Sequence, residues 1–251
     1  FDLFTKTGTL PVMKKRQQKP LKVDIITIFP ELVDPYLKGS ILGRGQKAGL
    51  LELKSHQLRD WTEDKHKTVD DKPFGGGPGM VMKVQPFHNA LVSLGLRKKD
   101  GTSTAKAKKA RVIITSAKGK RFTQEDAKRL SEYDQLVFLC GRYEGIDQRV
   151  IDHLCDEELR VGDYVLTGGE LAAMIMTDAA SRLREGVLGD FASLDVESHT
   201  TTGIGEEPQY TRPESYKIKG MKTAWDVPEV LMSGNHAHIE KWKKQERKPL
   251  D

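Results

Sequence analysis

The sequence predicts an α/β protein built around a parallel sheet. Three mostly apolar runs, at 23–28, 111–116 and 135–140, alternate along the chain with segments of helical periodicity, and the first two are rich in β-branched residues. Short continuous apolar runs are typical of buried strands, and strands that alternate with helices favour parallel crossovers. At 251 residues the chain can form one large domain or two unequal ones.

The first part of the chain predicts two strands and two helices. The strand at 23–28 is followed by a helix at 30–37, which begins with a proline, a residue favoured in a first helical turn. A second strand is expected at 50–53 and a second helix at 86–94. Between them, 59–80 is polar and then glycine-rich, and a loop of that length is usually functional or disordered.

The central part begins with a polar stretch. Residues 97–110 are mostly small or charged and predict a flexible surface excursion before the strand at 111–116. Thr123 and Asp126 then form a capping-box pattern, with Asp in place of Glu, that predicts a helix as far as Tyr133.

A strongly apolar helix is predicted from Gly169 to about Arg184. Its larger apolar side chains share one broad face: Leu171, Met174, Ile175, Ala179 and Leu183. Beyond it the sequence becomes polar and glycine-rich, and then predicts a short helix with Ile239 and Trp242 on its buried side.

These changes in composition divide the chain into four parts. They are a basic N-terminal extension at 1–22, an α/β domain at 23–188, a flexible linker at 189–205 and a small helical domain at 206–251. The basic cluster of the extension is not followed by an apolar core, so it does not fit a secretory signal.

The amino-acid composition restricts the possible partners and cellular location of the protein only in part. A net charge of +5 permits a polyanionic partner without requiring one. The two cysteines, Cys140 and Cys155, form no disulfide framework, which favours a reducing compartment. No stretch has the apolar length of a membrane span. We therefore expect a cytoplasmic protein without membrane association.

Three loops are expected to meet at one edge of the sheet. They are 115–119, 141–145 and 161–169, and each follows a predicted or short apolar strand. Ligands of open α/β sheets bind beyond the carboxyl ends of the strands, so these loops predict a pocket that offers backbone groups. The alternative is that all three are tight strand-to-helix turns.

Other motifs point to less specific roles. The glycine run at 75–79 lacks the lysine and hydroxyl residue of a phosphate-binding loop, and by itself it predicts a turn. His66, His199 and His236 lack metal-site spacing, which favours solvated or hydrogen-bonded roles. The basic run at 241–248 is typical of a solvated helix face, although it could also contact phosphates.

Several long motifs resemble the bacterial tRNA (guanine-N1-)-methyltransferase family, which belongs to the SPOUT class. The two later loops read CGRYEGID at 140–147 and GDYVLTGGEL at 162–171. The resemblance continues in DKHKTVDD at 64–71, which runs into GGGPGM at 75–80, and in the short motifs YTRP and VLMSG after residue 209. It extends over nearly everything from 23 to about 242.

The resemblance implies a fold and an activity. The fold would be a SPOUT-type parallel sheet with a deep trefoil knot on the C-terminal side, plus a small, mainly helical C-terminal domain. The family works as a homodimer that uses S-adenosylmethionine to methylate N1 of guanine 37 in tRNA, beside the anticodon. Two alternatives are a catalytically impaired RNA-binding paralogue and a SPOUT methyltransferase that acts on another RNA.

The resemblance also implies which residues bind S-adenosylmethionine. They are Pro78, Gly79, Ile114, Thr115, Ser116, Gly141, Tyr143, Glu144, Gly145, Val161, Gly162, Tyr164, Leu166, Gly168 and Gly169. The first loop departs from the family in having Ser116-Ala117 where Ser-Pro is usual. Magnesium is associated with the family, with Glu144 as a plausible contact, but the sequence contains no metal-binding constellation.

The chemistry requires a base and a group that stabilises negative charge. N1 of guanine carries a proton that a carboxylate can accept, and an arginine beside O6 can stabilise the charge that develops there. The resemblance implies Arg182 for the second role; the alternative is a surface pair with Asp178. The family's base is an aspartate, whose aligned position holds Glu197, and Asp195 is the alternative base.

Overall fold

The larger part of the molecule is organised around one parallel sheet. The computed structural model describes residues 19–189, 197–199, 201–220 and 222–250. Five strands lie in the order β2-β1-β6-β5-β7, and every neighbouring pair is parallel. They are β1 (Leu21–Thr27), β2 (Leu51–Gln57), β5 (Ala110–Arg121), β6 (Gln135–Cys140) and β7 (Glu157–Arg160). The predicted parallel α/β sheet is confirmed.

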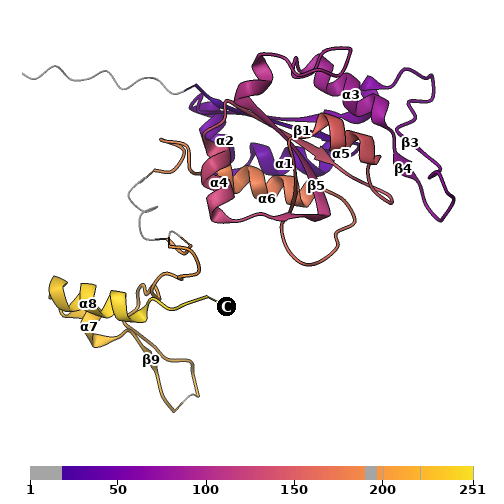
Figure 1. Ribbon diagram of the computed structural model, residues 1–251. Coiled ribbons are helices and arrows are strands. Elements are labelled where there is room, and N and C mark those ends of the chain that lie inside the picture. The colour runs from indigo at the N-terminus through magenta and orange to yellow at the C-terminus, as the bar shows by residue number, and fades with distance from the viewer. Residues whose placement is uncertain (1–18, 190–196, 200, 221, 251) are drawn as a thin grey trace, which may run out of the picture.

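Helices cover both faces of this sheet (Figure 1). One face carries α1 (Pro30–Lys38), α2 (Ser40–Lys47), α4 (Gln124–Ser131) and α6 (Glu170–Ser181). The other face carries α3 (Val84–Ser93) and α5 (Gln148–Leu154). The capping box predicted before α4 is present at Thr123 and Asp126.

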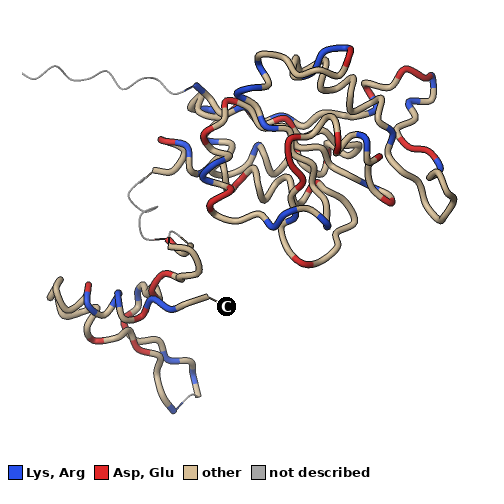
Figure 2. Tube along the Cα trace, in the orientation of Figure 1, with Lys and Arg blue, Asp and Glu red and all other residues tan. Residues whose placement is uncertain are grey.

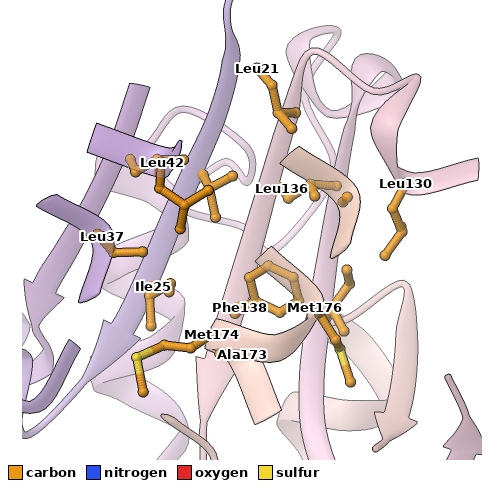
Figure 3. Packing of buried hydrophobic residues seen from close by; sticks show 14 of the residues in the cluster. Leu21, Ile25, Leu37, Leu42, Leu130, Leu136, Phe138, Ala173, Met174 and Met176 are labelled. Atoms are coloured by element: carbon orange, nitrogen blue, oxygen red, sulfur yellow. The ribbon is translucent and has the colours of Figure 1, made fainter. Parts of the chain in front are cut away.

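Each face of the sheet has its own apolar core. Strand side chains alternate between faces, so Ile25 packs in the core beneath α1 and α6, whereas Ile26 packs beneath α3. Figure 3 shows the first core, where Phe138 lies beside Met174 and Met176 of α6. Complete burial of such a side chain stabilises the fold by about 1.5–3 kcal/mol.

Strand β5 is interrupted at the edge where the loops were expected. Leu159 of β7 pairs with both Thr115 and Lys120, so the four residues between these two bulge out of the ladder. A Cβ on Gly119 would lie 2.6 Å from the main chain of Glu158, and glycine therefore permits this close approach. The predicted end of this strand at 116 is wrong, because the strand resumes beyond the bulge.

Local sequence signals misjudged three other segments. Helix α2 was not predicted, since two glycines lower its intrinsic helix propensity. The helix is stabilised instead by the burial of Leu42 and by the packing of Gly45 against Leu51. The predicted surface excursion at 97–110 begins with a buried Arg97, whose guanidinium donates to the Leu154 carbonyl at 2.6 Å. Strand β1 begins at Leu21, so two residues of the predicted extension belong to the sheet.

Helix α6 packs through small side chains. Its buried positions include Ala172, Ala173 and Ala180, which allow the helix to lie close to the sheet. Leu171 and Ile175, two members of the predicted apolar face, are instead 56% and 48% exposed. Apolar side chains are thus left uncovered on the outside of α6.

The C-terminal segment combines a hairpin with two helices. Its elements are β8 (Ser215–Tyr216), β9 (Trp225–Asp226), α7 (Glu229–Met232) and α8 (His236–Glu246). The predicted helix is confirmed as α8, but Ile239 and Trp242 are only half-buried, and the hairpin was not predicted. None of the helices in the described ranges combines the length and the hydropathy that crossing a membrane requires.

Three charged groups fix the edge strand β7. Glu157 accepts hydrogen bonds from Arg111 at 2.7 Å and from Arg129 at 2.9 and 3.0 Å. Burial opposes ionisation of this carboxyl, but the bonds from Arg129 and Arg111 together outweigh it and lower the pKa of Glu157. The stabilisation is therefore complete above the ordinary glutamate pKa of about 4.3 and is lost as the pH falls through the lowered value.

We expect Glu157→Gln to reduce the free energy of unfolding at pH 7 by roughly 1–3 kcal/mol, because two arginines lose a charged partner. The difference from the unmodified protein should shrink below about pH 4, where the native carboxyl is also protonated. Urea unfolding at several pH values measures both effects, with the exposed Glu132→Gln as control. A constant difference from pH 7 to pH 3 would contradict the assigned role of the ionised carboxyl.

Candidate functional site

The carboxyl ends of β5, β6 and β7 surround a cleft of about 420 Å³. That volume lies within the usual range of small-molecule sites. The predicted residues of all three loops line it: Ile114, Thr115, Ser116, Gly141, Tyr143, Glu144, Gly145, Val161, Gly162, Tyr164, Leu166, Gly168 and Gly169. Tertiary structure thus brings together three segments that are separated in the sequence.

Gly169 is the point where the three loops touch. Its N–H donates to the Gly141 carbonyl at 3.0 Å. A Cβ on Gly169 would lie 2.0 Å from Oγ1 of Thr115 and 2.9 Å from Cα of Cys140. Only a residue without a side chain allows this approach, so the shape of the cleft depends on this glycine.

Arg142, which sequence reasoning missed, joins the second loop to the third. Its Nε donates to Oε1 of Glu170 at 3.1 Å, and its NH1 donates to the Thr167 carbonyl at 3.3 Å. Glu170 is buried and also accepts a hydrogen bond from Oγ1 of Thr27 at 2.6 Å. The guanidinium lies over the Phe29 ring, 4.8 Å from its centroid.

This network ties the site to the end of β1. The signal for Arg142 was its position between two assigned loop residues, Gly141 and Tyr143, in the motif at 140–147. Its partner Glu170, and the bond from Thr27 to Glu170, could be found only from the fold, because the three residues are far apart in the sequence.

The glycine-rich loop between β3 (Asp70–Asp71) and β4 (Val81–Met82) stands beside this site. Glu144 N–H donates to the Met80 carbonyl at 3.0 Å, and Met82 N–H donates to the Gly145 carbonyl at 2.9 Å. Gly79 lies against the Glu144 side chain, since a Cβ there would be 2.4 Å from Oε1. Pro78 and Gly79 do not line the cleft, but Gly79 lies beside Glu144, which does line it.

The lining of the cleft combines apolar walls with backbone edges. Ile151, Leu159 and Ala172, which were not predicted, line it together with the assigned aliphatic residues. Tyr143 has a positive φ of 59°, which is uncommon for a tyrosine and costs of order 1–3 kcal/mol. Gly162 lies beneath the Tyr164 ring. Such a lining suits a flat ring system whose polar edge is recognised by main-chain groups.

Arg182 and Glu197 form a bidentate ion pair away from this cleft. NH1 of Arg182 lies 2.5 Å from Oε2 of Glu197, and NH2 lies 2.6 Å from Oε1. The hydrogen bonds from Arg182 lower the pKa of Glu197, and the same bonds raise the pKa of Arg182. Asp178 instead accepts a hydrogen bond from the Tyr36 hydroxyl, and Asp195 lies outside the described residues.

The pair stands at the opposite end of α6 from the cleft. Gly169 caps the start of this twelve-residue helix and Arg182 caps its end. At a rise of about 1.5 Å per residue, the two ends are roughly 18 Å apart. Within one chain, Arg182 and Glu197 therefore lie away from the three loops.

Among the described residues, the cysteines and histidines form no second reactive centre. Burial raises the pKa of the Cys140 thiol well above its ordinary value and that of Cys155 to about 12, so neither is a thiolate nucleophile. In the part of the chain that the structure describes, no three His, Cys, Asp or Glu side chains converge as a metal site. His66 is exposed, and His236 begins α8.

Comparison with known proteins places this architecture in a family. The family profile described as tRNA (Guanine-1)-methyltransferase TrmD matches residues 21–249. A tRNA (guanine-N(1)-)-methyltransferase of Ruminiclostridium cellulolyticum is 50% identical over 226 residues, which are 90% of this chain and 91% of the relative.

Proteins of the same name from two other organisms are similarly close. That of Pseudomonas putida is 48% identical over 89% of this chain and 83% of its own length. That of Halorhodospira halophila is 46% identical over 88% of this chain and 78% of its own length. With a profile match along almost the whole described chain and relatives of this identity, the chain belongs to the tRNA (guanine-1)-methyltransferase TrmD family.

Proposed function

We propose that this protein transfers a methyl group from S-adenosylmethionine to N1 of guanine 37 in tRNA. The observation that carries the proposal is the cleft, in which three glycine-containing loops of a family member meet at the carboxyl edge of the sheet. S-adenosylmethionine supplies a methyl group on a positively charged sulfur, so its departure needs no protein acid.

The cleft has features that fit S-adenosylmethionine. Aliphatic side chains such as Ile114, Leu159 and Leu166 form walls for a purine ring. Gly169 presents no side chain where it meets Thr115 and the main chain of Cys140, so main-chain groups stay accessible there. We assign binding to the thirteen predicted loop residues that line the cleft, with Pro78 and Gly79 closing one end, where Gly79 lies against Glu144.

The path of the chain supports a trefoil knot as the basis of this site. After the edge strand β7, the chain makes the third loop and returns under the sheet as α6, which packs against β1 and β6. The N–H of Gly169 bonds to Gly141 at that crossing. A knot would hold the three loops together without a disulfide or a metal.

In the proposed mechanism, Glu197 accepts the N1 proton of guanine and Arg182 donates to O6. As the proton passes to the carboxylate, the N1 electron pair forms the new bond to carbon, and the pair of the broken bond stays on sulfur. Arg182 stabilises the charge that develops on O6. The guanine edge must displace the bidentate pair, since Arg182 otherwise occupies both oxygens of the base.

We further propose a homodimer in which Arg182 and Glu197 of one copy serve the cleft of the other. Their position about 18 Å from their own cleft supports this arrangement. So does the exposed apolar surface of α1 and α6, to which Leu32, Tyr36, Leu171 and Ile175 contribute. Exposed apolar surfaces of this kind mark association sites.

Leu171→Glu together with Ile175→Glu is expected to convert the dimer to a monomer and to abolish turnover, because two charges would be buried at the interface. Sedimentation velocity measures the assembly state. Ser93→Glu, an exposed site on α3 across the sheet, adds a charge without touching this surface and should leave the dimer intact. A dimer that survives the double substitution would rule out this interface.

Two finer assignments accompany the proposal. The segment 206–251 would contact tRNA as a separate domain, joined to the 23–188 domain by the linker at 189–205. Glu144 could contribute one carboxylate to magnesium, whose other ligands would be water or substrate phosphate, as is usual for this ion.

The function is tested with labelled S-adenosylmethionine and tRNA transcripts that carry or lack guanines at positions 36 and 37. Incorporation only into transcripts with both guanines supports the proposal. Binding of S-adenosylmethionine and tRNA without incorporation would indicate an impaired RNA-binding paralogue. Incorporation into ribosomal RNA alone would indicate a SPOUT methyltransferase for another substrate.

A further inference from the structure

Two aromatic rings are exposed side by side on the hairpin formed by β8 and β9, here called the C-terminal hairpin (residues 215–226). Tyr216 and Trp225 are directly paired across the two strands, so their side chains share one face. Their ring centroids are 6.0 Å apart with an interplanar angle of 34°. The two residues are 54% and 58% exposed, so the fold leaves both rings open to solvent.

The hairpin extends away from the helices that follow it. Figure 1 shows it reaching beyond α7 and α8, with β9 on the strand that returns to them. The Val227 N–H donates to the Glu214 carbonyl at 2.8 Å and continues the ladder at its base. The aromatic pair is therefore presented on an ordered two-stranded support.

The charge around this pair is positive. Between 215 and 226 the sequence has three lysines and one aspartate. Lys217, Lys219 and Lys222 are all exposed, and within the described residues none of the three has an ion-pair partner within 4.0 Å. Figure 2 shows that the outer part of this hairpin carries blue, positively charged positions.

Uncovered aromatic faces with unpaired lysines fit a single-stranded nucleic acid. Unstacked bases stack on aromatic side chains, and lysines neutralise the adjoining phosphates. A protein partner that buried this surface would also have to bury three unpaired ammonium groups, which is unfavourable. The tilt between the two rings leaves their outer faces, rather than a slot between them, as the stacking surface.

We propose that the C-terminal hairpin binds an unpaired nucleotide of the tRNA substrate, stacking its base on Tyr216 and Trp225 while the lysines contact phosphates. This inference rests on the proposed function for the identity of the RNA. It assigns substrate affinity to a hairpin whose residues do not line the cleft, and it requires no change at the cleft.

The test measures tRNA binding and methyl transfer separately in the full chain. Trp225→Ala should weaken binding of a tRNA transcript by roughly 5- to 150-fold, the range for loss of one base stack. Trp225→Phe, which keeps an aromatic face, should restore most of the affinity. The single-turnover rate of methylation at saturating tRNA should be unchanged in both variants. The substitution should therefore raise KM for tRNA without changing the rate of the chemical step.

The salt dependence of tRNA affinity distinguishes the contribution of base stacking from that of the lysine charges. Replacing Lys217, Lys219 and Lys222 by Ala should reduce the slope of log affinity against log salt by about 0.7–0.9 for each lost phosphate contact. Lys98→Ala with Lys99→Ala removes exposed lysines elsewhere and serves as the matched control. If the lysine variant weakens binding but Trp225→Ala does not, the hairpin acts by charge alone and the stacking proposal is overturned.

A binding measurement also separates this proposal from the proposed function. If the protein binds tRNA through Trp225 but methylates no transcript, the hairpin assignment stands and the activity assignment fails. If it methylates tRNA while Trp225→Ala leaves KM and affinity unchanged, the activity stands and the hairpin assignment fails.

Discussion

Glu197→Gln is expected to lower the single-turnover rate of methyl transfer by roughly 10²- to 10⁴-fold, the usual contribution of a general base. Glutamine keeps the size of the side chain and a carbonyl oxygen for Arg182, but it cannot accept the N1 proton. Quenched-flow assays with saturating tRNA and S-adenosylmethionine measure the chemical step directly. Binding of S-adenosylmethionine should be unchanged, because Glu197 is assigned to the guanine and is not among the residues that line the cleft of its own chain.

Two companion variants make this result specific. Asp195→Asn tests the alternative base and should leave the rate near that of the unmodified protein. Glu197→Asp keeps a carboxylate and should retain more activity than the glutamine variant. Loss of transfer in Asp195→Asn, with normal transfer in Glu197→Gln, would assign the base to Asp195 instead.

The Glu197 variants should change stability little. The side chains of Arg182 and Glu197 are 31% and 26% exposed, and such partly solvated pairs contribute at most about 1 kcal/mol. Thermal unfolding of each variant therefore distinguishes a catalytic loss from a folding defect.

Gly169→Ala is expected to weaken binding of S-adenosylmethionine by roughly 5- to 150-fold, which is the cost of overpacking expressed as affinity. The new methyl group would lie 2.0 Å from Oγ1 of Thr115 and 2.9 Å from Cα of Cys140, and the second of these contacts is with main chain that cannot rotate away. The loops must separate, at a cost of roughly 1–3 kcal/mol for an overpacked site. Isothermal titration calorimetry measures the affinity and urea unfolding measures the stability.

Gly189→Ala is the matched control for this experiment. No atom lies within 4 Å of a Cβ placed there, and its φ is not in the left-handed region. It should therefore bind S-adenosylmethionine as the unmodified protein does. Normal binding by Gly169→Ala would show that the three loops do not need their close contact.

Much of the fold could be predicted from local pattern. The β6 strand was predicted with its observed bounds, and β1, α1, α3 and α4 were predicted within a few residues. Each of these segments is marked by a run of apolar residues, a proline or a helix cap. α2 escaped prediction, since packing rather than propensity holds its glycines in a helix.

The sequence by itself determined the alternation of strands and helices and the positions of the three loops, since periodicity and turn residues are local properties. Only the tertiary structure decided that Arg142 donates to Glu170, which also accepts from Thr27, that Gly169 touches two other loops, and that Leu171 and Ile175 face outward. It also decided that Arg182 pairs with Glu197 rather than with Asp178. Some of these contacts join residues that are far apart along the chain. In others, two partners are equally suitable by sequence spacing, and the close packing of the folded chain determines which one is in contact.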